Sequence, residues 1–244
     1  MLTIIVQILF LLLSVAIGGV LVVILEKKKQ QRLIRLSLAF SGGFLLAIAF
    51  IHFLPELYNE SKNTIGIWIL VGFLIQLFLE YFSGGIEHGH IHIHKDRKIP
   101  YVLLFSLSVH SFIEGMPLAG LEMKAHAHHL IGYHNNSLLL GIILHQLPVA
   151  IALMTLLRLT KLSYTKSWLL LLLFGIMTPM GLITGNLLQI NSHFEYMDVL
   201  LAIVVGMFLH ISTTIIFETN ENHRFNLAKL TAILLGVGLS FVLI

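Results

Sequence analysis

The segment Leu107-Ser-Val-His110-Ser-Phe-Ile-Glu114-Gly-Met-Pro117 lies within an apolar run that extends over residues 99–120. About 20 apolar residues are enough for one helix to cross the hydrocarbon core of a bilayer. His110 and Glu114 are four residues apart, so they project from one face of this helix, about one turn from each other. Ionisable side chains inside a membrane span are costly to insert, which makes each of them a candidate functional residue.

Seven more apolar runs accompany this one, and the eight runs predict an all-α membrane protein with eight transmembrane helices. They cover roughly residues 2–25, 36–58, 64–83, 99–120, 137–157, 167–190, 196–217 and 226–244. The composition agrees, because 57% of the 244 residues are hydrophobic and 11% are charged, whereas about a quarter of a soluble domain is charged. The first run is too long for a signal peptide and lacks its basic start. We therefore predict a single polytopic membrane domain over residues 1–244.

The basic residues predict the orientation of the spans. Thirteen of the 15 Lys and Arg residues lie between spans one and two, three and four, five and six, or seven and eight, and only Lys62 and Lys124 lie on the opposite side. Basic loops face the cytoplasm, so both termini are expected outside it. The net charge of +3 therefore reflects topology, and we predict no nucleic-acid partner. The basic segment Lys27–Arg35 is interpreted as an orientation signal, with a lipid-headgroup site as the alternative.

Histidine is unusually frequent, whereas cysteine is absent. The 14 histidines outnumber the 12 Asp and Glu residues, and the lack of cysteine excludes disulfides and thiolate metal sites. Four histidines, His88, His90, His92 and His94, fall in the predicted cytoplasmic loop at about 84–98. Such a tract either binds a divalent metal loosely or is a polar loop without a ligand. The outer loop 125–136 contains four more histidines and leaves the same two alternatives open.

Span five supplies a third polar group at the depth of His110 and Glu114. His145 lies near the midpoint of residues 137–157, beside Gln146 and Pro148. Spans four and five are antiparallel neighbours, so the two imidazoles and the carboxylate are able to converge. Such a set suits a borderline divalent ion such as Zn²⁺. Pro117 and Pro148 each remove a helix hydrogen bond, and we expect the carbonyls that they free, those of Ile113 and Leu144, to line a polar cavity.

Other spans carry weaker signals. His52 and Glu56 are four residues apart at the outer end of span two, and they are either an entrance site or interfacial capping residues. Gly181 and Gly185, which follow Pro179 in span six, predict close helix packing. His210 in span seven is interpreted as a hydrogen-bonded core residue, with a functional role as the alternative.

These motifs together resemble the ZIP (Zrt/Irt-like protein) family of divalent metal transporters over nearly the whole chain. His110-Ser-x-x-Glu114-Gly matches the signature of the family's fourth span, and His145-Gln-x-Pro resembles the His-Glu-x-Pro of its fifth. Gly42-Gly43 with His52-x-x-Pro-Glu56 is similar to its second span, and Thr178-Pro-Met-Gly to its sixth. The resemblance implies a bundle in which helices 1–3 and 6–8 form an inverted pseudo-repeat around helices 4–5. It also implies a frequent homodimer.

The chain departs from the family at one group of positions. Members that bind two metal ions carry carboxylates at the places of Gln146, Val149 and Thr178, and some have Asn at the place of Ser111. The resemblance therefore implies a single site of His110, Glu114 and His145. Ser111, Gln146 and Thr178 would be auxiliary at most.

The function expected from the sequence is transport of Zn²⁺ into the cytoplasm, with Fe²⁺, Mn²⁺ and Cd²⁺ as further candidates. No prosthetic group is expected, and the partners are metal ions, the lipid bilayer and a second copy of the chain. A membrane-embedded metal-dependent hydrolase or hydroxylase is the alternative, although the His-Glu-x-x-His pattern of zinc hydrolases is absent. The short loops favour a bacterial cell membrane.

Overall fold

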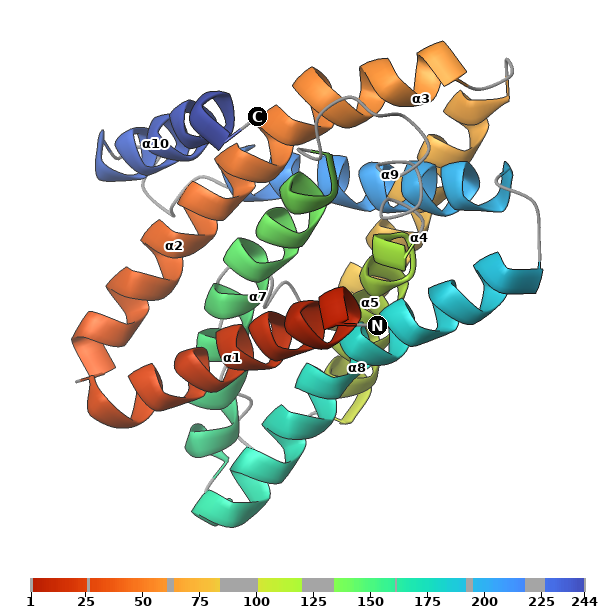
Figure 1. The fold of residues 1–244 in the computed structure, drawn as a ribbon. Coiled ribbons are helices and arrows are strands. Elements are labelled where there is room, and N and C mark those ends of the chain that lie inside the picture. Colours follow the sequence, from red (N-terminus) through yellow and green to blue (C-terminus); the bar gives the residue numbers. More distant parts are fainter. Residues whose placement is uncertain are drawn as a thin grey trace.

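The computed structural model describes residues 2–25, 27–60, 64–83, 101–119, 134–160, 162–191, 195–217 and 227–243, and in these residues it is helical without strands. The helices are α1 (Leu2–Ile24), α2 (Lys27–Ile48), the π-helical turn η1 (Ala49–Phe53), α3 (Leu54–Glu60), α4 (Ile65–Ser83), α5 (Tyr101–Gly115), α7 (His134–Leu159), α8 (Tyr164–Asn191), α9 (Glu195–Phe217) and α10 (Leu227–Leu243). Since α2, η1 and α3 follow one another directly, the described residues form eight helical segments, one for each predicted span (Figure 1).

Six of the eight segments are long and apolar enough to cross a membrane, and α5 and α10 are shorter, at 15 and 17 residues. Large apolar side chains on α1, α4 and α8 are exposed, as expected where lipid is the solvent. The five tyrosines that the structure describes are all exposed and lie near helix ends; they are Tyr58, Tyr81, Tyr101, Tyr164 and Tyr196. Tyrosine is enriched at membrane interfaces, so this placement supports the membrane assignment.

Span two differs from the predicted regular helix. Its helix begins at Lys27, so the basic segment continues the span, and it widens into a π turn at Ala49–Phe53. There the amide of Leu54 donates to the carbonyl of Ala49, five residues back. Pro55 follows at once; it has no amide hydrogen and its ring crowds the preceding turn, which explains why the wider turn occurs at this position. His52 lies within η1.

The helices pack mainly in pairs, α2 against α10, α4 against α9, α1 against α7 and α5 against α8. Glycines make the closest of these contacts possible. A Cβ atom at Gly72 of α4 would lie 1.9 Å from the carbonyl oxygen of Ile203 in α9, and one at Gly206 of α9 would lie equally close to Ile69 of α4. The backbones of α4 and α9 are therefore in direct contact at these two glycines.

We expect Gly72→Ala to lower both the folded yield and the thermal unfolding temperature, because the added methyl must push α9 away. Gly238→Ala is the matched control, since a Cβ there meets nothing within 4 Å and alanine favours a helix by about 1 kcal/mol over glycine. Size-exclusion profiles and melting curves of detergent-solubilised protein measure both effects. Equal behaviour of the two variants would contradict the close α4–α9 contact.

Candidate metal centre

The candidate centre lies in a polar layer between two apolar clusters. On α7, Leu138 and Ile142 belong to one cluster and the buried residues from Val149 to Leu157 belong to the other. His145 and Gln146 lie between them along the helix. The same order recurs on other helices, where the buried polar side chains between the two clusters are Ser14 on α1, Ser41 on α2, His110, Ser111 and Glu114 on α5, Thr178 on α8 and His210 on α9.

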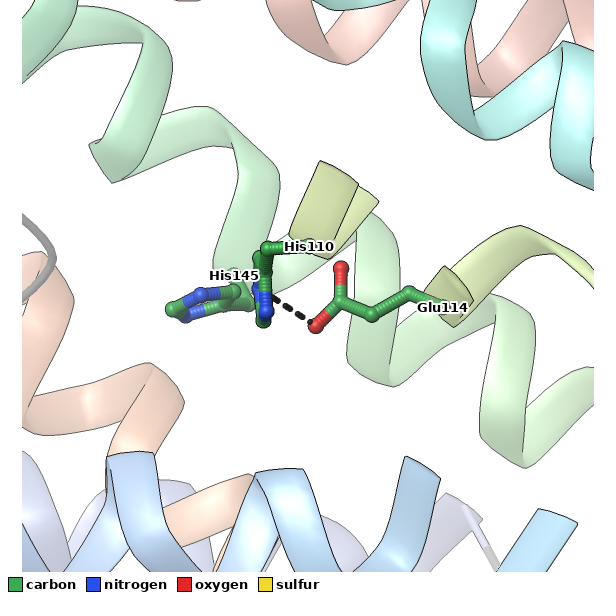
Figure 2. A group of neighbouring side chains, drawn as sticks. All are labelled: His110, Glu114 and His145. Atoms are coloured by element: carbon green, nitrogen blue, oxygen red, sulfur yellow. Dashed lines mark ion pairs between the residues drawn. The ribbon is translucent and has the colours of Figure 1, made fainter. Parts of the chain in front are cut away.

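Within this layer the structure brings His110, Glu114 and His145 together. His110 and Glu114 project from α5, and His145 reaches them from α7 (Figure 2). His110 Nε2 lies 2.9 Å from Glu114 Oε1. The His145 ring lies edge-on to that of His110, with 6.0 Å between the ring centroids. Among the described residues, these form the single group of three or more His, Cys, Asp or Glu side chains with the spacing of a metal site.

The environment of Glu114 favours a cation. Its side chain is 0% exposed, and neither of its oxygens accepts a hydrogen bond from the described residues. His110 Nε2 contacts Glu114 Oε1 at 2.9 Å. A buried carboxylate without hydrogen bonds carries a desolvation cost of several kcal/mol, about the scale expected for any buried ion. A bound divalent ion would offset this cost.

The spacing of the three side chains fits one small ion. Ligand atoms about 2.1 Å from a tetrahedral Zn²⁺ lie about 3.4 Å from one another. The candidate ligand atoms lie within 4.8 Å of one another, and His110 Nε2 and Glu114 Oε1 are 2.9 Å apart. Adjustments of about 1 Å would bring them to coordination distance, which is within the reach of side-chain rotation.

Helix α5 ends at this site, which corrects one expectation. We expected Pro117 to leave the carbonyl of Ile113 free to line a cavity. Instead the amide of Met116 donates to that carbonyl at 3.2 Å, closing a tighter final turn, as is common at helix ends. Glu114 therefore lies in the last turn of α5. The negative end of the helix dipole lies there and favours a cation.

Glycines allow α8 to approach α5 closely beside the site. A Cβ at Gly181 would lie 2.0 Å from the carbonyl oxygen of Phe112, and one at Gly185 would lie equally close to that of Met116. The close packing predicted from these two glycines is confirmed. Gly115, next to Glu114, faces the carbonyl of Thr178 in the same way.

Two of the three positions implied as auxiliary, Gln146 and Thr178, form a neutral hydrogen-bonded chain with Ser14. Gln146 Nε2 donates to Thr178 Oγ1, and Gln146 Oε1 lies 3.4 Å from Ser14 Oγ, which also donates to the carbonyl of Leu11 at 2.8 Å. The three side chains come from α7, α8 and α1, and each is at most 3% exposed. Their polar groups are thus engaged with one another. Ser111 is also buried, on α5 beside His110.

The structure does not join His52 and Glu56 to a third ligand. His52 is in η1 and Glu56 in α3, and both are partly exposed. Within the described parts of the chain, His110, Glu114 and His145 form the one group with the spacing of a metal site, and His52 and Glu56 do not belong to it. The entrance role of His52 and Glu56 therefore stays a prediction. His88, His90, His92 and His94 lie outside the described residues, as do His126, His128 and His129 of the outer loop.

Sequence reasoning missed two side chains on α4. Gln76 lies 2.7 Å from His110 Nδ1 through its Oε1 atom. One turn further, Glu80 pairs with Nε2 of His210 on α9, whose ring also meets Phe73 edge-on. His210 is thus a buried, partnered histidine, in agreement with the core interpretation. The four-residue spacing of Gln76 and Glu80 was a signal in the sequence, but it does not reveal which helices they face.

Comparison with protein families gives one match. A family model described as ZIP Zinc transporter matches residues 1–98 and 85–244, which together span the chain. No curated protein matches the sequence significantly.

Proposed function

Because the chain belongs to the ZIP zinc transporter family, whose members transport divalent metals across membranes, we propose that its cargo is Zn²⁺ and that the ion moves into the cytoplasm. His110, Glu114 and His145 are the proposed ligands. Fe²⁺, Mn²⁺ and Cd²⁺ are the competing ions to be tested. The proposed location is a bacterial inner membrane, with the whole chain forming one membrane domain and with a homodimer as the assembly.

The observation that carries the proposal is the buried group of two imidazoles and one carboxylate in the polar layer. A divalent ion must lose water ligands to cross the apolar clusters on either side. Two nitrogens and a carboxylate oxygen replace part of this hydration shell, and the carboxylate supplies the charge that a low-dielectric site requires. The ligand set also leaves a coordination position open, which suits an ion that must be released.

We infer that one ion occupies the site at a time. Gln146 and Thr178, which are bonded to each other, occupy two of the three positions where two-metal members of the family carry carboxylates, and Val149 occupies the third. Glu114 is the one buried carboxylate among the described residues, so a second divalent ion there would meet no further buried negative charge. The neutral side chains therefore support a single-ion site.

The proposed topology assigns an outer and a cytoplasmic end to the route of the ion. With thirteen basic residues on the cytoplasmic side, the termini face outward and the His-rich loop faces inward. His52 and Glu56 would then collect the ion at the outer mouth of span two. The inner loop would receive the ion after its release.

We also propose the inverted pseudo-repeat, on the strength of the packing pattern. The repeat would relate α1 to α8, α2 to α9, α4 to α10 and α5 to α7. Under this relation the contact of α2 with α10 corresponds to that of α9 with α4. The contact of α1 with α7 likewise corresponds to that of α8 with α5. The glycine contacts follow the same exchange, with Gly43 and Gly236 between α2 and α10 and with Gly72 and Gly206 between α4 and α9. In transporters built this way, one unit moves against the other around a central site.

The test is uptake into proteoliposomes. Purified protein is reconstituted, and accumulation of radioactive Zn²⁺ is followed with and without competing Fe²⁺, Mn²⁺ or Cd²⁺ at defined pH on each side. We expect saturable Zn²⁺ uptake that protein-free vesicles lack. Vesicles that bind Zn²⁺ without accumulating it would contradict transport, and stronger competition by another ion would reassign the cargo.

The inner histidines give a separate prediction. Replacing His88, His90, His92 and His94 together with serine is expected to leave most of the maximal uptake rate intact and to change the apparent affinity or the regulation, because a His-rich tract of this spacing holds metal only loosely. The same uptake assay, normalised to reconstituted protein, measures both. Complete loss of uptake in this variant would show that the loop is a required relay.

A further inference from the structure

A buried glutamine on a neighbouring helix contacts the proposed site from behind. Gln76 of α4 is 0% exposed, and its Oε1 atom lies 2.7 Å from His110 Nδ1. An amide oxygen only accepts hydrogen bonds, so in this arrangement Nδ1 carries the proton and donates it. His110 Nε2, on the other side of the ring, faces Glu114 at 2.9 Å.

This arrangement fixes which nitrogen is available to a metal ion. A neutral imidazole carries its proton on one ring nitrogen and has a lone pair on the other. With Nδ1–H held by Gln76, the lone pair lies on Nε2 and points into the group of His110, Glu114 and His145. Outer hydrogen bonds of this kind set both the tautomer and the ring orientation of histidine ligands.

We propose that Gln76 is a positioning residue for metal binding, acting through His110. It holds the imidazole as the Nδ1–H tautomer and presents Nε2 to the ion. This inference rests on the proposed function, because it takes His110 to be a ligand. The partner is a neutral amide, whereas many metal-binding histidines donate to a carboxylate that raises their basicity. A neutral partner orients the ring without strengthening the metal bond, which suits a site that must release its ion.

The structure offers a matched control for the contact between α4 and α5. Ser106 of α5 donates from Oγ to the carbonyl of Leu79 in α4 at 2.6 Å, and it is buried one turn before His110. Ser106→Ala removes a hydrogen bond between the same two helices without touching the imidazole. A general loosening of this helix pair would affect both variants, whereas a role in orienting the ring affects Gln76 alone.

The experiment measures Zn²⁺ and Cd²⁺ binding to the full-length protein in nanodiscs by calorimetry, together with melting temperatures. Gln76→Leu is expected to weaken binding by about 10- to 100-fold, the usual cost of losing an outer hydrogen-bond partner. Gln76→Glu, which still accepts from Nδ1–H, is expected to bind at least as tightly as the wild type and to release metal more slowly. Ser106→Ala is expected to bind as the wild type does. NMR of isotope-labelled histidine in the Cd²⁺-loaded protein should show the metal on Nε2 of His110.

The outcomes separate the two proposals. If His110→Ala binds metal as the wild type does, the proposed site is wrong. If His110→Ala loses binding while Gln76→Leu keeps it, or if NMR shows the metal on Nδ1, the inference about Gln76 fails and the site stands. Equal losses in Gln76→Leu and Ser106→Ala, with equal drops in melting temperature, would reduce Gln76 to a packing residue. Should Gln76→Leu fail to fold, the inference is tested by the metal affinity of Gln76→Glu and by the NMR spectrum, which shows whether the metal is bound to Nε2 or Nδ1 of His110.

Discussion

Glu114→Gln is expected to lower the initial rate of Zn²⁺ uptake by about 100-fold or more, on the scale of the 3–5 kcal/mol that separates a paired from an unpaired buried charge. The substitution keeps the size of the side chain and removes its charge. In the sequence, Glu114 is the one carboxylate that lies more than three residues from the ends of a predicted span. In the structure it is completely buried and contacts His110. Without it, a divalent ion would have to shed water in a low-dielectric site that offers only neutral ligands.

The comparison variants for Glu114→Gln separate charge from geometry. Glu114→Asp keeps the charge on a shorter side chain and should retain more uptake than the glutamine variant. Asp198→Asn removes a carboxylate near the start of α9, away from the polar layer, and should transport normally. Rates are normalised to the amount of folded, reconstituted protein. Wild-type uptake by Glu114→Gln would show that the ion crosses elsewhere.

The course of the chain through the membrane was predictable because apolar length alone sets it. All eight predicted spans correspond to helical segments, and most ends agree within a few residues. The differences arise where local chemistry overrides hydropathy. Pro117 ends α5 at Gly115, before the end of its apolar run, and Pro55 follows the π turn. The basic residues after Lys27 were interpreted as a loop, but they are good helix formers and simply extend α2.

The candidate site was predictable in part. The four-residue spacing of His110 and Glu114 fixed their shared face, and the predicted depth of His145 brought it near them. Partners from non-adjacent helices were not predictable in this way, because spacing along one helix does not say which neighbour it faces. Gln76 and Glu80 lie on α4, and their partners lie on α5 and α9. Ser14 was also missed, because an isolated serine in an apolar helix carries no signal of its own.

His145→Ala is expected to reduce Zn²⁺ affinity and uptake by more than about 100-fold, because even the loss of an outer-shell partner typically costs 10- to 100-fold. The variant removes an imidazole whose ring lies edge-on to that of His110 in the buried group. Two ligands from α5 alone would remain, and α7 would no longer be tied to the ion. Calorimetry in nanodiscs and uptake in proteoliposomes measure the two effects independently.

Gln146→Ala is the matched comparison, since Gln146 is adjacent to His145 and equally buried. We expect mild effects on uptake and a loss of stability of about 1–3 kcal/mol, because the hydroxyl of Thr178 loses the buried amide that donates to it. Thr178→Val removes the same hydrogen bond by a change in α8 instead of α7. It should likewise lower stability and have only a mild effect on uptake. The three variants together distinguish one bound ion from two. If Gln146→Ala, although folded, lost uptake as completely as His145→Ala, the amide would be a ligand. The single-ion proposal would then be wrong, and a second metal site that includes Gln146 would have to be sought.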